Sequence, residues 1–150
     1  MMLVGTGGGA SRQAISYTYS SNTANASLNL SSIAGYSAGL SDITITVNSG
    51  IYLYSTSTGG YGLNLSGGTT GDTLTIVNNG YIMGQGGNGG SANPNTGDWG
   101  QPGSAGGPAI NLGFGMTSCT INNTNVSAYI GGGGGGGGAS ANPGYSAVST

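Results

Sequence analysis

Side chains that could do acid–base or nucleophilic chemistry are few in this sequence. Charged residues make up 3% of its 150 residues, namely Arg12, Asp42, Asp72 and Asp98. The nine tyrosines and Cys119 lose their protons only at higher pH. General acid–base catalysis needs a histidine, or two carboxylates whose environments push their pKa values apart. There is no histidine and the aspartates are widely spaced, so the sequence predicts a protein that is not an enzyme and holds no cofactor.

Nucleic acid and membrane partners are also excluded by composition. A formal net charge of −2 with a single arginine gives no basic surface for phosphates. No apolar run approaches the ~20 residues of a membrane-spanning helix. The first five residues lack the cationic and apolar regions of a secretory signal peptide.

One glycine-rich stretch resembles a nucleotide-binding motif in spacing alone. Residues 84–89 match G-x-G-x-x-G, but Pro94 and Pro102 follow in place of the helix that would hold a pyrophosphate. Glycine-rich calcium repeats need an aspartate in each copy, and Asp98 is the sole aspartate nearby. We therefore expect neither a nucleotide nor a metal here.

The residues best suited to recognition lie in two polar turns. The single tryptophan is in the middle of residues 93–102, and a second turn follows at 142–145. Both begin with Ser-Ala-Asn-Pro, at 91–94 and 140–143. The tryptophan either packs over the neighbouring glycines as a lid or forms a recognition loop that contacts a sugar or a protein surface. The candidate receptor-binding residues are Asn95, Asp98, Trp99 and Tyr145.

The elements that would position these turns are short β-strands. Apolar and polar residues alternate with period two in 15–19, 42–47 and 72–77, and no segment shows a helical period. Tyr17, Tyr19, Leu28, Asn29, Leu30 and Ser31 recur 35 positions later as Tyr52, Tyr54, Leu63, Asn64, Leu65 and Ser66. Ile110-Asn111-Leu112 is a third Leu-Asn-Leu copy, and Tyr129-Ile130 repeats Tyr81-Ile82.

Repeats of this length predict stacked units, since one unit cannot bury its own apolar face. The predicted fold is all-β with essentially no helix: a β-solenoid, or a trimeric β-prism in which three chains supply the three walls. Repeated Asn or Ser, facing inward, would stack in hydrogen-bonded ladders. Cys119 is expected to be a small buried residue on a strand, without an internal disulfide partner.

Glycine is 35 of the residues and is densest in 84–107 and 131–138. Such runs are either flexible linkers or extended helices of three residues per turn, polyglycine II, packed side by side. Their recurrence at equivalent places favours packed helices. The chain then divides into an N-terminal arm (1–13), a β-repeat scaffold (14–83), a glycine-rich insertion with a tryptophan tip (84–107), a last β-repeat (108–130) and a second glycine-rich segment (131–150).

A family resemblance rests on residues 81–90, on 106–110, and on Tyr129-Ile130 followed by polyglycine. From 42 to 145 the chain resembles the glycine-rich receptor-binding tips of tailed-phage fibres, of the lambda-like central tail fibre and T-even polyglycine adhesin types. The resemblance implies a virion protein in a tail fibre or tail tip, facing the extracellular medium. Its implied partners are a host surface protein or polysaccharide and other tail proteins.

The leading hypothesis is a non-enzymatic binding module, expected to be a homotrimer. One rival is a structural decoration or fibre-shaft protein without a receptor. Another is an ice-binding protein, which predicts a planar, solvent-facing array of threonines such as Thr44, Thr46, Thr73 and Thr75.

Overall fold

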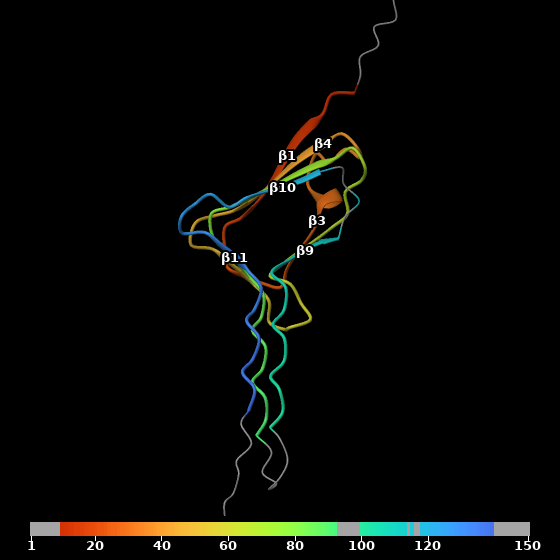
Figure 1. Ribbon diagram of the computed structural model, residues 1–150. Helices are drawn as coiled ribbons and strands as arrows, with labels where there is room; N and C mark the ends of the chain where they lie inside the picture. The colour runs from red at the N-terminus through yellow and green to blue at the C-terminus, as the bar shows by residue number, and fades with distance from the viewer. Residues whose placement is uncertain (1–9, 93–99, 114, 116–117, 140–150) are drawn as a thin grey trace, which may run out of the picture.

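The computed structural model describes residues 10–92, 100–113, 115 and 118–139 (Figure 1). These residues form an all-β structure of parallel sheets, in which the one helical element is the 3₁₀ turn η1 (Leu30–Ser32). No helix in this part of the chain is long and apolar enough to cross a membrane. The strands are β1 (Gln13–Tyr19), β2 (Thr23–Ala24), β3 (Ala26–Asn29), β4 (Ser41–Val47), β5 (Tyr52–Tyr54), β6 (Leu63–Ser66), β7 (Thr73–Asn78), β8 (Tyr81–Met83), β9 (Ile110–Gly113), β10 (Ser118–Asn122) and β11 (Tyr129–Gly131).

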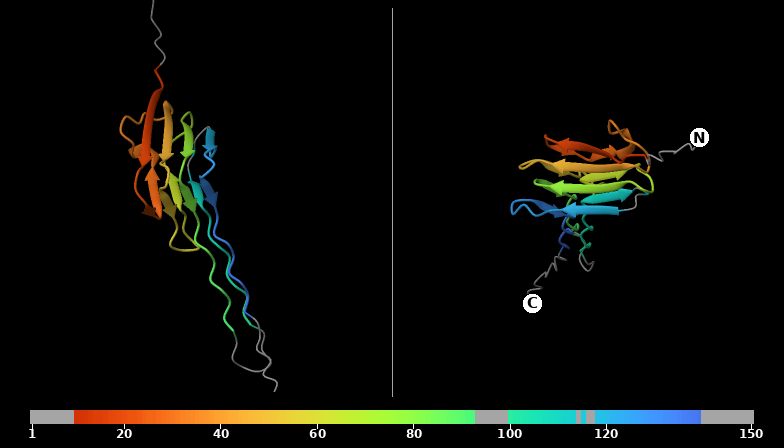
Figure 2. Two further views of the ribbon diagram at one scale, coloured as in Figure 1. Left: turned by 90° about the vertical axis from the view of Figure 1, so that its left-hand side faces the viewer. Right: turned by 90° about the horizontal axis from the view of Figure 1, so that it is seen from above.

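The chain passes through three sheets in turn and adds one strand to each on every pass. Sheet A has the order β1-β4-β7-β10, sheet B the order β11-β8-β5-β2, and sheet C the order β3-β6-β9. The three sheets enclose a triangle in Figure 1, and Figure 2 shows successive passes lying side by side. A single chain therefore supplies strands to all three walls.

Alternation along each strand sends its apolar side chains into the triangle. On β4, Ile43, Ile45 and Val47 are buried, and the residues between them are half-buried on the outer face. Because neighbouring strands are parallel and in register, Ile45 stacks on Ile76 of β7. The core consists of such columns, and its buried members are Tyr19, Ala26, Leu30, Ile33, Ile43, Ile45, Val47, Leu53, Leu63, Leu65, Leu74, Ile76, Ile82 and Ala109.

The 35-residue displacement predicted for the first repeat is wrong. Leu28 pairs with Leu65, a displacement of 37. Tyr17 lies on β1 in sheet A, whereas Tyr52 lies on β5 in sheet B. Register is set by which side chains share a core column, and turns of unequal length shift the spacing from pass to pass.

The later repeats are confirmed in register. Leu63-Asn64-Leu65 pairs with Ile110-Asn111-Leu112, and Tyr81-Ile82 pairs with Tyr129-Ile130. The connection from β8 to β9 contains the extra length of the first glycine-rich segment, and equivalent strands still pair.

Asparagine ladders connect successive passes on both faces of the wall. Inside, Asn78 is fully buried and donates to Oδ1 of Asn123 over 2.7 Å. On the outer face of sheet C, Asn111 donates to Oδ1 of Asn64 over 2.8 Å. Both leucines of β6 occupy the core, so the asparagine of the Leu-Asn-Leu element faces outward, and the inward ladder predicted for this repeated asparagine is wrong. Cys119 on β10 is half-buried beyond Leu74, and this burial raises the pKa of its thiol.

The described charged side chains gather where the strands of sheet A begin. Both Asp42 oxygens accept from Arg12 Nε, at 2.9 and 3.0 Å, and Thr73 Oγ1 donates to Asp42 over 2.6 Å. The bonds from Arg12 and then Thr73 lower the pKa of Asp42 to about 2. The hydrogen bonds between Arg12 and Asp42 also raise the pKa of the Arg12 guanidinium. Arg12 and Asp42 thus form an exposed ion pair at one end of sheet A.

This cluster predicts a specific acid titration. The folded pKa of Asp42 lies below the 3.8 of an unperturbed aspartate, so its contribution to stability is present above about pH 4 and is lost as pH falls through about 2. In Arg12→Gln we expect the pKa of Asp42 to rise toward 3.8 in an NMR carboxyl titration. Among the described residues no hydrogen bond joins Asp72 to Arg12, and their charges interact more weakly than those of Arg12 and Asp42, so the pKa of Asp72 should rise less and serves as the internal comparison. An unchanged Asp42 titration would contradict the assignment.

Candidate receptor-binding tip and its glycine segments

Three glycine-rich segments leave the β structure together. The first (84–92) follows β8, the second (100–107) returns toward β9, and the third (131–139) begins at the end of β11. Figures 1 and 2 show them running side by side, away from the corner between sheets B and C. They project as a stalk from the triangle of sheets.

Nine backbone hydrogen bonds of 2.8–3.1 Å join the three segments in a cycle, three from each. The first segment donates to the third, the third to the second, and the second to the first. Donors recur at every third residue. They pair Gly84 with Gly131, Gly87 with Gly134, Gly90 with Gly137, Gly133 with Gly107, Gly136 with Ser104, Ala139 with Gln101, Gln101 with Ser91, Ser104 with Asn88, and Gly107 with Gln85.

The pairing fixes the direction of each segment. The first and third run parallel, since bonded residues rise together from Gly84 and Gly131. The second is antiparallel to both, since its donors rise from Gln101 while their acceptors in the first segment descend from Ser91. Each segment therefore uses two sides of its backbone to bond two neighbours.

Inward-facing positions in this stalk require glycine. A Cβ at any of them would overlap a carbonyl oxygen of an adjacent segment. These positions are Gly84, Gly87, Gly90, Gly100, Gly103, Gly106, Gly133 and Gly136. Without side chains the backbones approach within hydrogen-bonding distance, which offsets the conformational entropy lost on ordering glycine.

The four sequence-predicted receptor-binding residues lie outside the described part of the chain. Asn95, Asp98 and Trp99 belong to the connection between the first and second segments, and Tyr145 follows the third. The structure does describe the residues next to these two turns. Gln101 N donates to Ser91 O over 3.0 Å, and Ala139 N donates to Gln101 O over 3.1 Å. Both predicted turns thus start from neighbouring points at the far end of the stalk.

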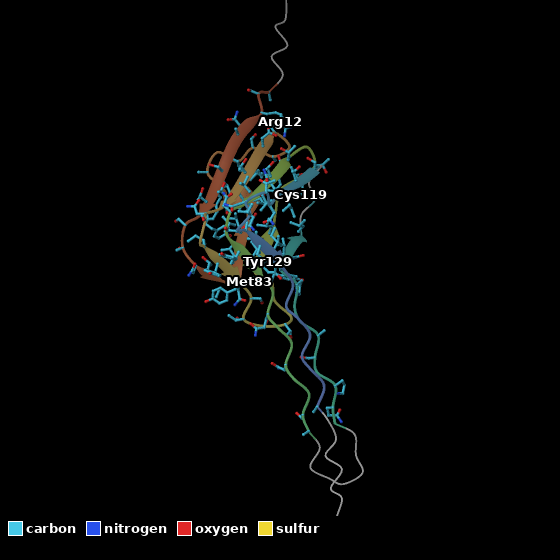
Figure 3. The ribbon with its side chains drawn as sticks, turned by 60° about the vertical axis from the view of Figure 1, so that its left-hand side comes forward. Arg12, Met83, Cys119 and Tyr129 are labelled. Atoms are coloured by element: carbon cyan, nitrogen blue, oxygen red, sulfur yellow. The ribbon has the colours of Figure 1, made fainter. Side chains whose placement is uncertain are left out.

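The described residues of the stalk carry no ionisable side chain. Figure 3 shows Arg12 at the opposite end of the β structure, and Met83 and Tyr129 where the stalk begins. Among the residues that the structure describes, no group of acidic, cysteine or histidine side chains could hold a metal ion. The stalk itself can offer backbone groups and small polar side chains, but no acid or base.

A tyrosine column on the outer face of sheet B was missed by sequence reasoning. Tyr52 and Tyr81 stack with centroids 4.5 Å apart and planes at 12°. Tyr129 continues the column on β11 and is half-exposed. Tyrosine is the first residue of β5, β8 and β11, and this recurrence was the signal that could have revealed the column.

The family model of the phage tail fibre adhesin Gp38 matches residues 14–149. The chain belongs to the Gp38 family of phage tail fibre adhesins. Searches among curated proteins and among solved structures gave no significant match. The match covers the three sheets, the stalk and both predicted turns.

Membership of the Gp38 family confirms the resemblance to tailed-phage fibre adhesins. It places this Gp38-family chain in the virion tail, facing the host. Adhesins of this kind bind a host receptor and join the tail, and they are structural rather than catalytic proteins.

Proposed function

We propose that this Gp38-family chain is a β-solenoid whose three glycine segments form a polyglycine II bundle, and that the bundle presents the predicted turns at 93–102 and 142–145 to a host receptor. The observation that carries this proposal is the cycle of backbone bonds repeating every three residues. Three residues per turn without internal bonds is the geometry of polyglycine II, whose backbone groups bond between neighbours.

A bundle of this kind suits receptor binding because it is stiff without large side chains. Two neighbours bond each segment, so the ends at Ser91, Gln101 and Ala139 are held together. Loops that start from a fixed base lose less entropy when they bind. One chain already closes all three walls, which supports a solenoid over a three-chain prism. A homotrimer stays a prediction from the sequence.

The recognition chemistry would come from the turns. Trp99 and Tyr145 offer flat amphipathic surfaces, while Asn95 and Asp98 offer hydrogen-bonding groups. This combination fits a neutral polysaccharide or a loop of a surface protein.

Replacing Trp99 by alanine tests this function directly. We expect binding of the purified protein to host cells to weaken at least ~30-fold, which corresponds to a hot-spot loss of about 2 kcal/mol. The matched control is Tyr54→Ala, which removes a similarly large aromatic from the outer face of sheet B, where it is 39% exposed. Wild-type binding by the Trp99 variant would contradict a receptor role for this turn.

The fibre-shaft and ice-binding hypotheses are tested by separate observations. A fibre-shaft role predicts that the soluble protein fails to compete with phage for host cells, whereas the adhesin role predicts competition. The threonines of the ice-binding hypothesis do face outward on sheet A, and Thr44 pairs with Thr75. Thr46 pairs with Val77 and Thr73 with Asp42, so the array is interrupted, and we do not propose ice binding.

A further inference from the structure

The corner between sheets B and C is closed differently on successive passes. On the first pass a single residue connects β2 to β3, namely Asn25, whose φ of 50° is one that asparagine tolerates. On the second pass the connection from β5 to β6 takes residues 55–62, which we call the corner loop. On the third pass the connection from β8 to β9 contains the first two segments of the stalk. One residue is enough to turn this corner, so the corner loop is longer than the turn requires.

The corner loop lies against the base of the stalk. Figure 2 shows the stalk leaning away from the first two passes, with the loop beside its base on the side of those passes. A Cβ built on Gly107 would be 2.6 Å from Thr58 O, and its three nearest atoms all belong to Thr58. Gly107 is buried, whereas Gly103 and Gly106 of the same segment are half-buried. The backbones of the loop and the second segment are therefore in direct contact.

Both ends of the corner loop also contact Met83, the last residue of β8 before the stalk. Ser55 N donates to Met83 O over 2.9 Å. At the other end, a Cβ on the buried Gly62 would lie 2.6 Å from Met83 O and 2.9 Å from Met83 N. The loop thus contacts the stalk where the first segment leaves the sheets, at Met83, and where the second segment returns to them, at Gly107.

The corner loop is itself held in place from the first pass. Ser55 is 2% exposed, and its hydroxyl donates to Ser57 O over 2.7 Å. Asn25 donates to Thr56 Oγ1 over 2.7 Å and accepts from Thr56 N over 3.0 Å. Asn25 N also donates to Tyr54 O over 2.7 Å. A series of contacts therefore runs from the corner of the first pass, through the corner loop, to the base of the stalk.

We propose that the corner loop sets the direction of the stalk, and so positions the receptor-binding turns relative to the three sheets. The stalk segments join the third and fourth passes, at β8, β9 and β11. Glycine follows both β8 and β11, and its wide range of dihedral angles would let the stalk tilt at these joints. The corner loop belongs to the second pass and supports the base from the side of the earlier passes, which prevents this tilt.

This inference rests on the proposed function only for what the stalk carries. Turns held in one direction lose less orientational freedom when they bind a receptor. The direction of the stalk can be measured without any receptor, so it is tested independently of the turns.

NMR residual dipolar couplings, which report whether two parts of a molecule share one orientation, test the proposal. In the wild type, the amides of the stalk and of the sheets should fit one orientation. In Gly107→Ala the new methyl group pushes Thr58 away, and the stalk couplings should lose about a third of their magnitude relative to the sheets, the difference between rigid and flexible backbone. The matched control is Gly59→Ala in the same loop, where a Cβ meets nothing within 4 Å and the couplings should not change.

A second variant removes the support without adding a clash. Replacing residues 55–62 by a single asparagine copies the connection of the first pass, and it should release the stalk in the same way. Wild-type couplings in either this variant or Gly107→Ala would overturn the proposal, and so would an equal loss of couplings in Gly59→Ala.

Two further measurements separate this role from the bundle and from the receptor turns. Hydrogen exchange at the amides of Gly87 and Gly90, which bond to the third segment, should be unchanged in both variants. Faster exchange there would assign the lost couplings to a broken bundle and would overturn the proposal. Failure of the receptor function would be a different result, namely Trp99→Ala binding host cells as tightly as the wild type.

Discussion

Gly106→Val is expected to open the stalk. Its Cβ would overlap the carbonyl oxygen of Gly133, at the point where the second and third segments touch. The segments must separate there, which removes bonds such as Gly133 N to Gly107 O at 2.8 Å. Each lost bond is worth about 1 kcal/mol, so two or three accelerate exchange of the bundle amides roughly 30-fold or more. The acceleration is measured by hydrogen exchange at the amides of Gly84, Gly87 and Gly133.

The adjacent residue provides a matched control. Ala105→Val adds a comparable volume one position earlier, at an exposed site that already bears a Cβ. It should leave amide exchange in the bundle unchanged. Host-cell binding should fall in Gly106→Val and persist in Ala105→Val, since the turns keep a common base only in the latter. Equal exchange in both variants would show that the glycine period has no structural role.

Asp72→Ala is expected to cost the most stability among substitutions of polar residues in the β structure. The carboxylate is fully buried and accepts from Ser41 N at 3.0 Å, Tyr36 Oη at 2.8 Å and Thr69 N at 2.9 Å. Burial by itself raises the pKa of Asp72, but these bonds and one from Gly39 outweigh it and lower the pKa. Removing the carboxylate leaves its hydrogen-bond donors without an acceptor, which lowers the free energy of unfolding by on the order of 3 kcal/mol.

Urea denaturation measures this loss, with Asp42→Ala as the control. Asp42 is solvent-exposed and its partners can turn to water, so its removal should shift the midpoint much less. Because the folded pKa of Asp72 is depressed, its contribution is present above the unfolded value and is lost as pH falls. The difference between wild type and Asp72→Ala should therefore shrink in acid. Equal midpoints for the two alanine variants would contradict the assigned network.

Local sequence patterns predicted the strands well because alternation is a local property. Ile43, Ile45 and Val47 could be assigned to one face before any neighbour was known, and the same alternation marked the strand that became β7. The register between strands of different passes could not be predicted from such local patterns. The match of Tyr17 with Tyr52 was misleading, because similar residues can serve different sheets when the number of residues per pass varies.

The polar side chains at the start of sheet A also make contacts that the sequence did not predict. Arg12, Asp42 and Asp72 are about thirty residues apart in sequence, and each was read as an isolated charge. Stacking of one pass on the next brings Arg12 onto Asp42, and Asp72 beneath the backbone of Ser41. No local sequence pattern indicates such contacts, because they depend on which strands become neighbours when successive passes stack.

The sequence alone was enough to establish that this protein has no histidine and only four charged side chains, to predict strands from alternation, and to show that its glycine runs recur. The tertiary structure decided that one chain closes three walls and that the runs bond in a cycle. It also decided which glycines are obligatory. Gly136 and Gly135 are indistinguishable in a run of eight, yet one faces a neighbouring carbonyl and the other faces outward. Their difference arises only when three backbones meet, since each turn of three residues presents a different side to each neighbour.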